Sequence, residues 1–238
     1  MPVLRPAVSR PVLIAAAVAM AGALAAACSS GSGTTPAANA SATITAVGAE
    51  NEYANVIGQV GGKYVQVSAI ESNPNTDPHS FEASASVASL ISSAGLVVQN
   101  GLGYDTYMNK IEAAAPNSGR KVIDVQHLLG LPDSTPNPHL WYKPSTMPAV
   151  AKAVAAGLAD LQPAHKAYFA AKAAAFEASL QPWYHAIAQF KAHYPGTPVA
   201  TTEPVGDYLL QAAGTRNLTP FTFQADVMNG VEDRKSTR

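Results

Sequence analysis

The chain contains a single cysteine, Cys28, among its 238 residues. A disulfide needs two cysteines, so one chain can form none, and we expect no thiolate metal site because this one cysteine is predicted to be acylated. Charged residues make up only 13% of the sequence, and the formal net charge is −1. Because nucleic-acid-binding proteins carry a strongly basic surface, this composition argues against a nucleic-acid partner.

The first 27 residues have the layout of a secretory signal, with two arginines, an apolar run and a small-residue end. Cys28 follows directly and resembles the acylated cysteine of a bacterial lipoprotein, although Ala25 stands where leucine is more usual. An uncleaved membrane anchor is the alternative, and both predict a protein tethered at the extracytoplasmic face of the cell membrane. Residues 28–42 are rich in Ser, Gly, Thr and Ala, which predicts a flexible linker.

Between residues 43 and 142, short apolar segments alternate with segments whose apolar residues have helical spacing. We predict strands at 44–48, 64–70, 96–100 and 121–125, with helices at 51–62, 84–94 and 104–115. This alternation is typical of an α/β lobe with a mainly parallel sheet. Ligands of such sheets bind where loops leave the carboxyl ends of the strands.

Residues 143–194 are predicted to be helical, with a helix at 145–161 and a very long one at 163–194. Pro182 removes a hydrogen bond from the long helix and should kink it. Its apolar residues recur at spacings of three and four and form one stripe, consisting of Phe169, Ala173, Phe176, Leu180, Trp183, Ile187, Phe190 and Tyr194. A helix of this length between two α/β regions indicates a connector.

The alternation restarts in residues 195–238, with predicted strands at 198–202 and 218–223 around a predicted helix at 204–214. One or two parallel strands cannot bury both faces of a sheet, and a region this small rarely holds its own core. Either these residues pack onto the first lobe or the chain is cut short, and we expect a partial second α/β lobe, cut short at its C-terminus.

Two histidines occur in nearly the same local sequence, DPHSF at 77–81 and NPHLW at 137–141. Proline restricts its own φ angle and the preceding residue, so His79 and His139 start from a stiff backbone. The aromatic residue two positions further on can shield each imidazole from water. Two turns with exposed histidines are the alternative.

Glu203 follows the predicted strand at 198–202 and precedes Pro204, which suits the first position of a helix. Its carboxylate is either a group presented at a strand end or an acid favoured near a helix N-terminus. Two neutral imidazoles and one carboxylate suit Zn²⁺, Mn²⁺ or Fe²⁺. The remaining histidines are expected to be solvated helix or turn residues: His127, His165, His185 and His193.

Five stretches together resemble the metal-specific solute-binding lipoproteins of ABC importers, the zinc, manganese and iron class (ZnuA- or TroA-like). They are DPHSFEAS (77–84), LVVQNGLGYDTYMNK (96–110), NPHLWY (137–142), TTEPVGDYLLQAAG (201–214) and FTFQADVMNG (221–230). The resemblance implies two α/β lobes joined by a long backbone helix, with the metal held in the cleft between them. It also implies a monomeric, non-enzymatic receptor that delivers its ion to a membrane permease.

By this resemblance, His79 and His139 are the ligands from the first lobe, and Glu203 is the first ligand from the second. A fourth ligand, commonly an aspartate, has no match after Gly230, so we expect an incomplete and weaker site. Zinc-type members often carry a His-rich loop, but residues 112–136 contain one histidine, which leaves Zn²⁺ against Mn²⁺ or Fe²⁺ open. The family has also been linked to cell adhesion, but these residues argue neither for nor against that role.

Two other functions compete with metal transport. A zinc hydrolase could use two histidines and a glutamate, but it normally takes two ligands from one helix in an HExxH pattern, which this chain lacks. A receptor for an organic solute would carry several aromatic residues and an arginine at the loop ends. The sequence favours metal binding over both.

Overall fold

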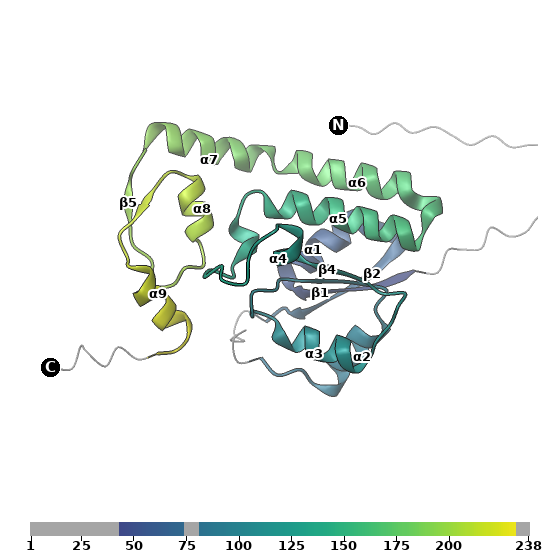
Figure 1. The fold of residues 1–238 in the computed structure, drawn as a ribbon. Helices are drawn as coiled ribbons and strands as arrows, with labels where there is room; N and C mark the ends of the chain where they lie inside the picture. The colour runs from purple at the N-terminus through teal and green to yellow at the C-terminus, as the bar shows by residue number, and fades with distance from the viewer. Residues whose placement is uncertain (1–42, 74–80, 232–238) are drawn as a thin grey trace, which may run out of the picture. The chain divides into compact units, whose positions relative to one another are not determined.

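The computed structural model describes residues 43–73 and 81–231. Four parallel strands form one sheet in the order β2-β1-β3-β4 (Figure 1). Their bounds are Ile44–Glu50 (β1), Val65–Glu71 (β2), Leu96–Gln99 (β3) and Lys121–Asp124 (β4). The central strands β1 and β3 are apolar runs, as expected where helices cover both faces of a parallel sheet. The predicted α/β class and parallel sheet are confirmed.

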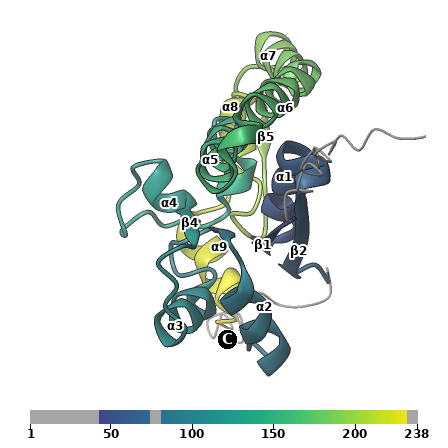
Figure 2. The same ribbon diagram turned by 90° about the vertical axis from the view of Figure 1, so that its right-hand side faces the viewer.

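Helices cover both faces of this sheet (Figures 1 and 2). On one face lie α1 (Asn51–Gly61), α5 (Thr146–Leu161) and α6 (Lys166–Ser179), which pack on Ala46, Leu96 and Val98. On the other face lie α2 (Ala85–Ser93) and α3 (Thr106–Ala114), which pack on Val47 and Val97. Neighbouring residues of one strand thus belong to different cores, as the two-residue period of a strand requires.

Glycine permits close packing beside β1 and an unusual backbone after β3. A Cβ on Gly48 would collide with the backbone of Ala54 in α1, so only glycine allows this helix to approach the strand so closely. After β3, Gly101, Leu102 and Gly103 all have positive φ angles, of 80°, 54° and 78°. Leu102 is strained there, because a side chain disfavours left-handed backbone.

The long helical region is interrupted at Leu180, which separates α6 from α7 (Gln181–His193). Pro182 lies in the first turn of α7, so the predicted kink is confirmed at the expected place. Residues 163–165 form a separate 3-10 turn, η4 (Pro163–His165), rather than the start of the helix. The predicted single apolar stripe is buried in α6 at Phe169, Ala173 and Phe176, whereas α7 contains no buried residue.

Residues after α7 form a two-stranded parallel sheet and two helices. The elements are β5 (Pro198–Val199), α8 (Asp207–Ala212), β6 (Arg216–Asn217) and α9 (Phe221–Met228). The predicted strand at 198–202 and helix at 204–214 are therefore both shorter than expected.

The predicted strand at 218–223 is wrong, because the second strand lies earlier, at β6, and Phe221 begins α9. Pro220 precedes the helix, and its carbonyl accepts hydrogen bonds from the backbone N–H groups of Phe223 and Gln224. A proline suits this place because its own nitrogen has no hydrogen to donate. Aromatic and threonine residues favour strands in general, but here they form the first turn of a helix.

Three short elements complete the described chain: η1 (Gly62–Tyr64), α4 (Val125–Leu128) and η3 (Leu140–Tyr142). Across residues 43–73 and 81–231, no helix has the length and apolar character needed to cross a membrane. The predicted signal at 1–27 and the whole predicted linker at 28–42, including Cys28, lie outside the described residues.

Candidate metal centre

His139 lies immediately before η3 and is only 4% exposed. Its ring is flanked edge-on by Trp141, with ring centroids 5.4 Å apart, and by Tyr104, at 5.7 Å. The predicted shielding of this imidazole by Trp141 is therefore confirmed, and Tyr104 adds a second aromatic wall that the local sequence did not indicate. The alternative of an exposed turn is excluded for His139.

Asn137 fixes the orientation of the His139 ring. Its side-chain oxygen Oδ1 lies 2.8 Å from His139 Nδ1 and accepts a hydrogen bond from the His139 backbone N–H at 3.0 Å. An imidazole that is hydrogen-bonded through one nitrogen presents the other nitrogen in a defined direction, as metal ligands require.

Asn100, directly after β3, is hydrogen-bonded to the segment that carries His139. Tyr53 Oη donates to Asn100 Oδ1 at 2.6 Å, and Asn100 Nδ2 donates to the carbonyl of Pro138 at 2.8 Å. The carboxyl end of a central strand thus supports the residue preceding His139. The Asn-Gly pair that ends the apolar run at 96–100 was the available signal for this role.

Glu203 lies in the turn between β5 and α8 and is half-buried. The next residue, Pro204, is buried, and its carbonyl accepts a hydrogen bond from Asn137 Nδ2 at 2.7 Å. This bond joins the turn that carries Glu203 to the segment that carries His139, although the two are far apart in the sequence. Two of the three predicted ligand residues are thus on connected segments.

His79 lies outside the described residues, so its place beside His139 stays a prediction. Within residues 43–73 and 81–231, no three His, Cys, Asp or Glu side chains are grouped closely enough to hold a metal ion. Of the three predicted metal ligands, His139 and Glu203 lie in the described part of the chain. The predicted site of three ligands is complete only with His79.

The other predicted histidines fall where expected, with one exception. His185 and His193 are exposed on α7, and His127 is exposed in α4, 3.5 Å from Asp124 Oδ1. His165 lies in η4 and is only partly exposed, and its ring stacks on Tyr64 with centroids 3.8 Å apart. Its place in η4, beside η1, causes this contact.

A group of buried acids at the carboxyl ends of the strands was not predicted. Glu50 ends β1 and pairs in register with Glu71, which ends β2. Glu50 is 3% exposed, and its carboxylate oxygens have no hydrogen-bond partner in the described structure. Burial raises the pKa of Glu50 well above its ordinary value, and the nearby carboxylates of Asp105 and Glu71 raise it further.

Asp105 is the best-supported of these acids. Its carboxylate accepts hydrogen bonds from the backbone N–H groups of Asn100, at 2.6 Å, and Gly101, at 3.0 Å. Burial raises the pKa of Asp105 to about 6, although these two N–H groups act in the opposite direction. Asp105 therefore holds the left-handed loop after β3 in place, which is a structural role. A charged residue at the end of a buried strand was the signal for Glu50, but strand register was needed to bring it to Glu71.

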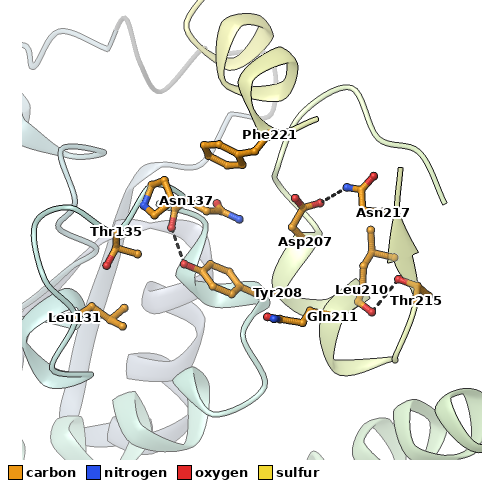
Figure 3. Close-up of a pocket in the computed structure, with 11 residues that line it drawn as sticks. Leu131, Thr135, Asn137, Asp207, Tyr208, Leu210, Gln211, Thr215, Asn217 and Phe221 are labelled. Atoms are coloured by element: carbon orange, nitrogen blue, oxygen red, sulfur yellow. Dashed lines mark hydrogen bonds between the residues drawn. The ribbon is translucent and has the colours of Figure 1, made fainter. Parts of the chain in front are cut away.

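A cavity of about 610 Å³ adjoins Asn137 on the side of α8 and α9. Figure 3 shows Tyr208 reaching toward Asn137, with Phe221 and Leu131 also on the cavity wall. Tyr208 Oη donates to the Asn137 carbonyl at 2.8 Å. Asp207 is occupied by hydrogen bonds from Asn217 and Gln224, so the carboxylate on this wall is already satisfied.

The sequence profile of the family described as zinc-uptake complex component A, periplasmic (ZnuA), matches residues 47–234. The chain belongs to this family. Its members are solute-binding proteins of ABC importers and not enzymes, so the resemblance found in the five sequence stretches is confirmed. No protein with a curated description matches the chain.

Several solved structures share the fold of this chain. TroA, the periplasmic zinc-binding protein of Treponema pallidum, is 21% identical with a TM-score of 0.64, over 74% of this chain and 65% of TroA. Zn(II)-bound AdcA of Streptococcus pneumoniae is 20% identical with a TM-score of 0.63, over 75% of this chain and 40% of AdcA.

The metal-dependent lipoprotein YcdH of Bacillus subtilis is 18% identical with a TM-score of 0.66, over 74% of this chain and 66% of YcdH. At these identities the likeness establishes the fold. The chain spans less than two thirds of the length of AdcA and TroA.

Proposed function

We propose that this chain captures a divalent transition metal, Zn²⁺ or Mn²⁺ with Fe²⁺ as a further candidate, outside the cell membrane and delivers it to an ABC permease. The observation that carries the proposal is a buried imidazole, His139, held in one orientation by Asn137 and joined through it to the turn of Glu203. Family membership supports the same function. The metal is cargo, and no bond is made or broken.

The proposed ligands are His79, His139 and Glu203. Neutral imidazole nitrogens and a carboxylate form a donor set that suits Zn²⁺, Mn²⁺ and Fe²⁺. Tyr104 and Trp141 flank His139 and limit the access of water to it, which favours a dehydrated ion. The choice among these metals depends on donors beyond His139 and Glu203.

We further propose that residues 43–142 and 195–238 act as two lobes on either side of the metal, connected by the helices of residues 143–194. The four-stranded sheet and the two-stranded sheet, with α5, α6 and α7 between them in sequence, support this division. Acylation at Cys28, after removal of residues 1–27, would hold the monomer at the extracytoplasmic face through the linker at 28–42. The lipoprotein nature of YcdH supports the anchor.

Metal content tests the proposed function. The purified chain should bind one divalent ion, measured by elemental analysis and by titration calorimetry, and both His79→Ala and His139→Ala should lose it. His185→Ala is the matched control, because that histidine is exposed on α7 and belongs to no proposed site. Equal metal content in all four proteins would refute the ligand assignment.

A further inference from the structure

Asn137 connects two parts of the molecule through its side chain and its backbone carbonyl. In the described part of the chain, two hydrogen bonds join residues 43–161 to residues 195–231, and both end on Asn137. Its Nδ2 donates to the Pro204 carbonyl at 2.7 Å, and its carbonyl accepts from Tyr208 Oη at 2.8 Å. Asn137 is 6% exposed, so water competes little for these groups.

The orientation of the Asn137 amide follows from its partners. The backbone N–H of His139 can only donate and the carbonyl of Pro204 can only accept. Oδ1 must therefore face His139, and Nδ2 must face Pro204. No other assignment of the amide satisfies both contacts.

This orientation determines the tautomer of His139. Oδ1 of an amide has no hydrogen, so the 2.8 Å contact with His139 Nδ1 requires the hydrogen to be on Nδ1. A neutral His139 then carries its lone pair on Nε2, the state that a metal ion requires of an imidazole. Trp141 and Tyr104, edge-on to the ring, restrict its rotation.

The same amide therefore acts on both ligand-bearing segments. Pro204 directly follows Glu203, so the bond from Nδ2 to the Pro204 carbonyl fixes the Pro204–Val205 peptide group, one residue beyond Glu203 in the same turn. A displacement of this turn would pull on the amide whose Oδ1 orients His139. The geometry of one ligand thus depends on the position of the other.

We propose that Asn137 is a positioning residue that couples His139 to the Glu203 turn. A divalent ion then meets both donor groups correctly placed, or neither. The proposal rests on the proposed function, in which His139 and Glu203 bind the ion. It assigns to one asparagine both the tautomer of the imidazole and the placement of the opposing carboxylate.

Three substitutions separate the two roles. Asn137→Asp keeps an acceptor for His139 but loses the donor to Pro204, while Asn137→Ala loses both. Tyr208→Phe removes only the bond to the Asn137 backbone and is the matched control. Each variant used should have a melting temperature close to that of the wild type, which shows that it folds. If Asn137→Ala does not fold, Asn137→Asp still tests the coupling.

The tautomer and the coupling can each be measured in metal-free protein by NMR. Ring ¹⁵N shifts should show His139 with its hydrogen on Nδ1 in the wild type, Asn137→Asp and Tyr208→Phe, and a mixture of tautomers in Asn137→Ala. The carbonyl ¹³C shift of Pro204 should move in both Asn137 variants and stay in place in Tyr208→Phe. Unchanged shifts in Asn137→Ala would overturn the proposal.

Titration with Zn²⁺ and Mn²⁺ gives the third measurement. Loss of a group that orients a metal ligand typically weakens binding 10- to 100-fold. We expect about 10-fold for Asn137→Asp, about 100-fold for Asn137→Ala and less for Tyr208→Phe. Wild-type affinity in Asn137→Asp would overturn the coupling. A wild-type protein that binds no metal would overturn the proposed function instead. The NMR shifts are measured without metal, so they test the role of Asn137 even in that case.

Discussion

The two halves of the long helical region, α6 and α7, have the same spacing of apolar residues, but these residues are buried in α6 and largely exposed in α7. In α6, Phe169 is fully buried and Phe176 is 8% exposed, because α1 and α5 pack against that side. In α7, Phe190 is 40% exposed, and Tyr194, directly after the helix, is 60% exposed. Spacing predicts which face of a helix is apolar, but neighbouring elements decide whether that face is buried.

The same contrast holds beyond the helix. The residues of both apolar cores lie between Ala46 and Phe176, whereas large exposed apolar side chains of the described chain gather after residue 189, including Leu218, Phe221 and Phe223. The packed part of the molecule, residues 43–179, and its C-terminal part, residues 180–231, should therefore respond differently to equivalent substitutions.

The largest difference is expected for phenylalanine truncation. Phe169→Ala should lower the free energy of unfolding by about 3–5 kcal/mol, because it removes a fully buried ring and leaves a cavity. Phe190→Ala, the matched change on α7, should cost less than about 1 kcal/mol, because the ring is already substantially exposed. Urea denaturation followed by circular dichroism measures both. Similar losses would show that α7 is covered in solution.

A smaller, pH-dependent difference is expected for buried and exposed acids. The raised pKa of Glu50 means that the folded state binds this proton more tightly than the unfolded state, so the wild type loses stability as pH rises above about 4.5. Glu50→Gln should remove that loss and stabilise the protein at pH 8 by roughly 1–3 kcal/mol, the scale of an unsatisfied buried polar group. The gain should vanish toward pH 4.5.

Asp226→Asn is the control for the pH experiment, because Asp226 is exposed on α9 in the C-terminal part. Its effect should stay within about 0.5 kcal/mol at every pH. Thermal melts between pH 4.5 and 8 test both variants. A Glu50→Gln protein that is less stable than the wild type at pH 8 would mean that the Glu50 carboxylate is solvated.

The smallest effect is expected at the boundary between the two parts. Pro182 lies in the first turn of α7, where its missing N–H removes little. Pro182→Ala should therefore change the free energy of unfolding by less than about 1 kcal/mol, with a slight gain in helical circular dichroism. A stabilisation near 3 kcal/mol would instead indicate that Pro182 sits in the interior of one continuous helix.

Local patterns predicted the packed part of the molecule well. The strands β1 and β3 are mostly apolar and buried, and their helices carry apolar residues at regular spacing, so pattern and packing agree. The wrong prediction of a strand at 218–223 arose where the local sequence pattern and the packing disagree. Gln224 is buried in α9 and donates to Thr201 and Asp207, contacts between residues distant in sequence that no local pattern reveals.

The candidate site was predicted in part. Pro138 indicated a stiff backbone before His139, the strand predicted before Glu203 indicated a carboxylate at a strand end, and the structure connects the two segments. The roles of Asn100, Asn137 and Glu50 depend on which strand ends and loops meet, so they required the fold. His79 stays a prediction.

The attachment of residues 195–231 to the rest of the molecule has a mechanical consequence. Residues 195–231 are joined to the rest covalently through α7, which is itself held where Tyr184 Oη donates to the Pro144 carbonyl, and noncovalently at Asn137. Lys143 Nζ also lies over the Tyr208 ring, and Tyr208 packs against the larger apolar core, so the noncovalent contacts of this part gather on α8 and the turn before it. Glu203 directly precedes Pro204, one of the bonded residues, and is therefore held next to the contacts that resist a displacement of this part.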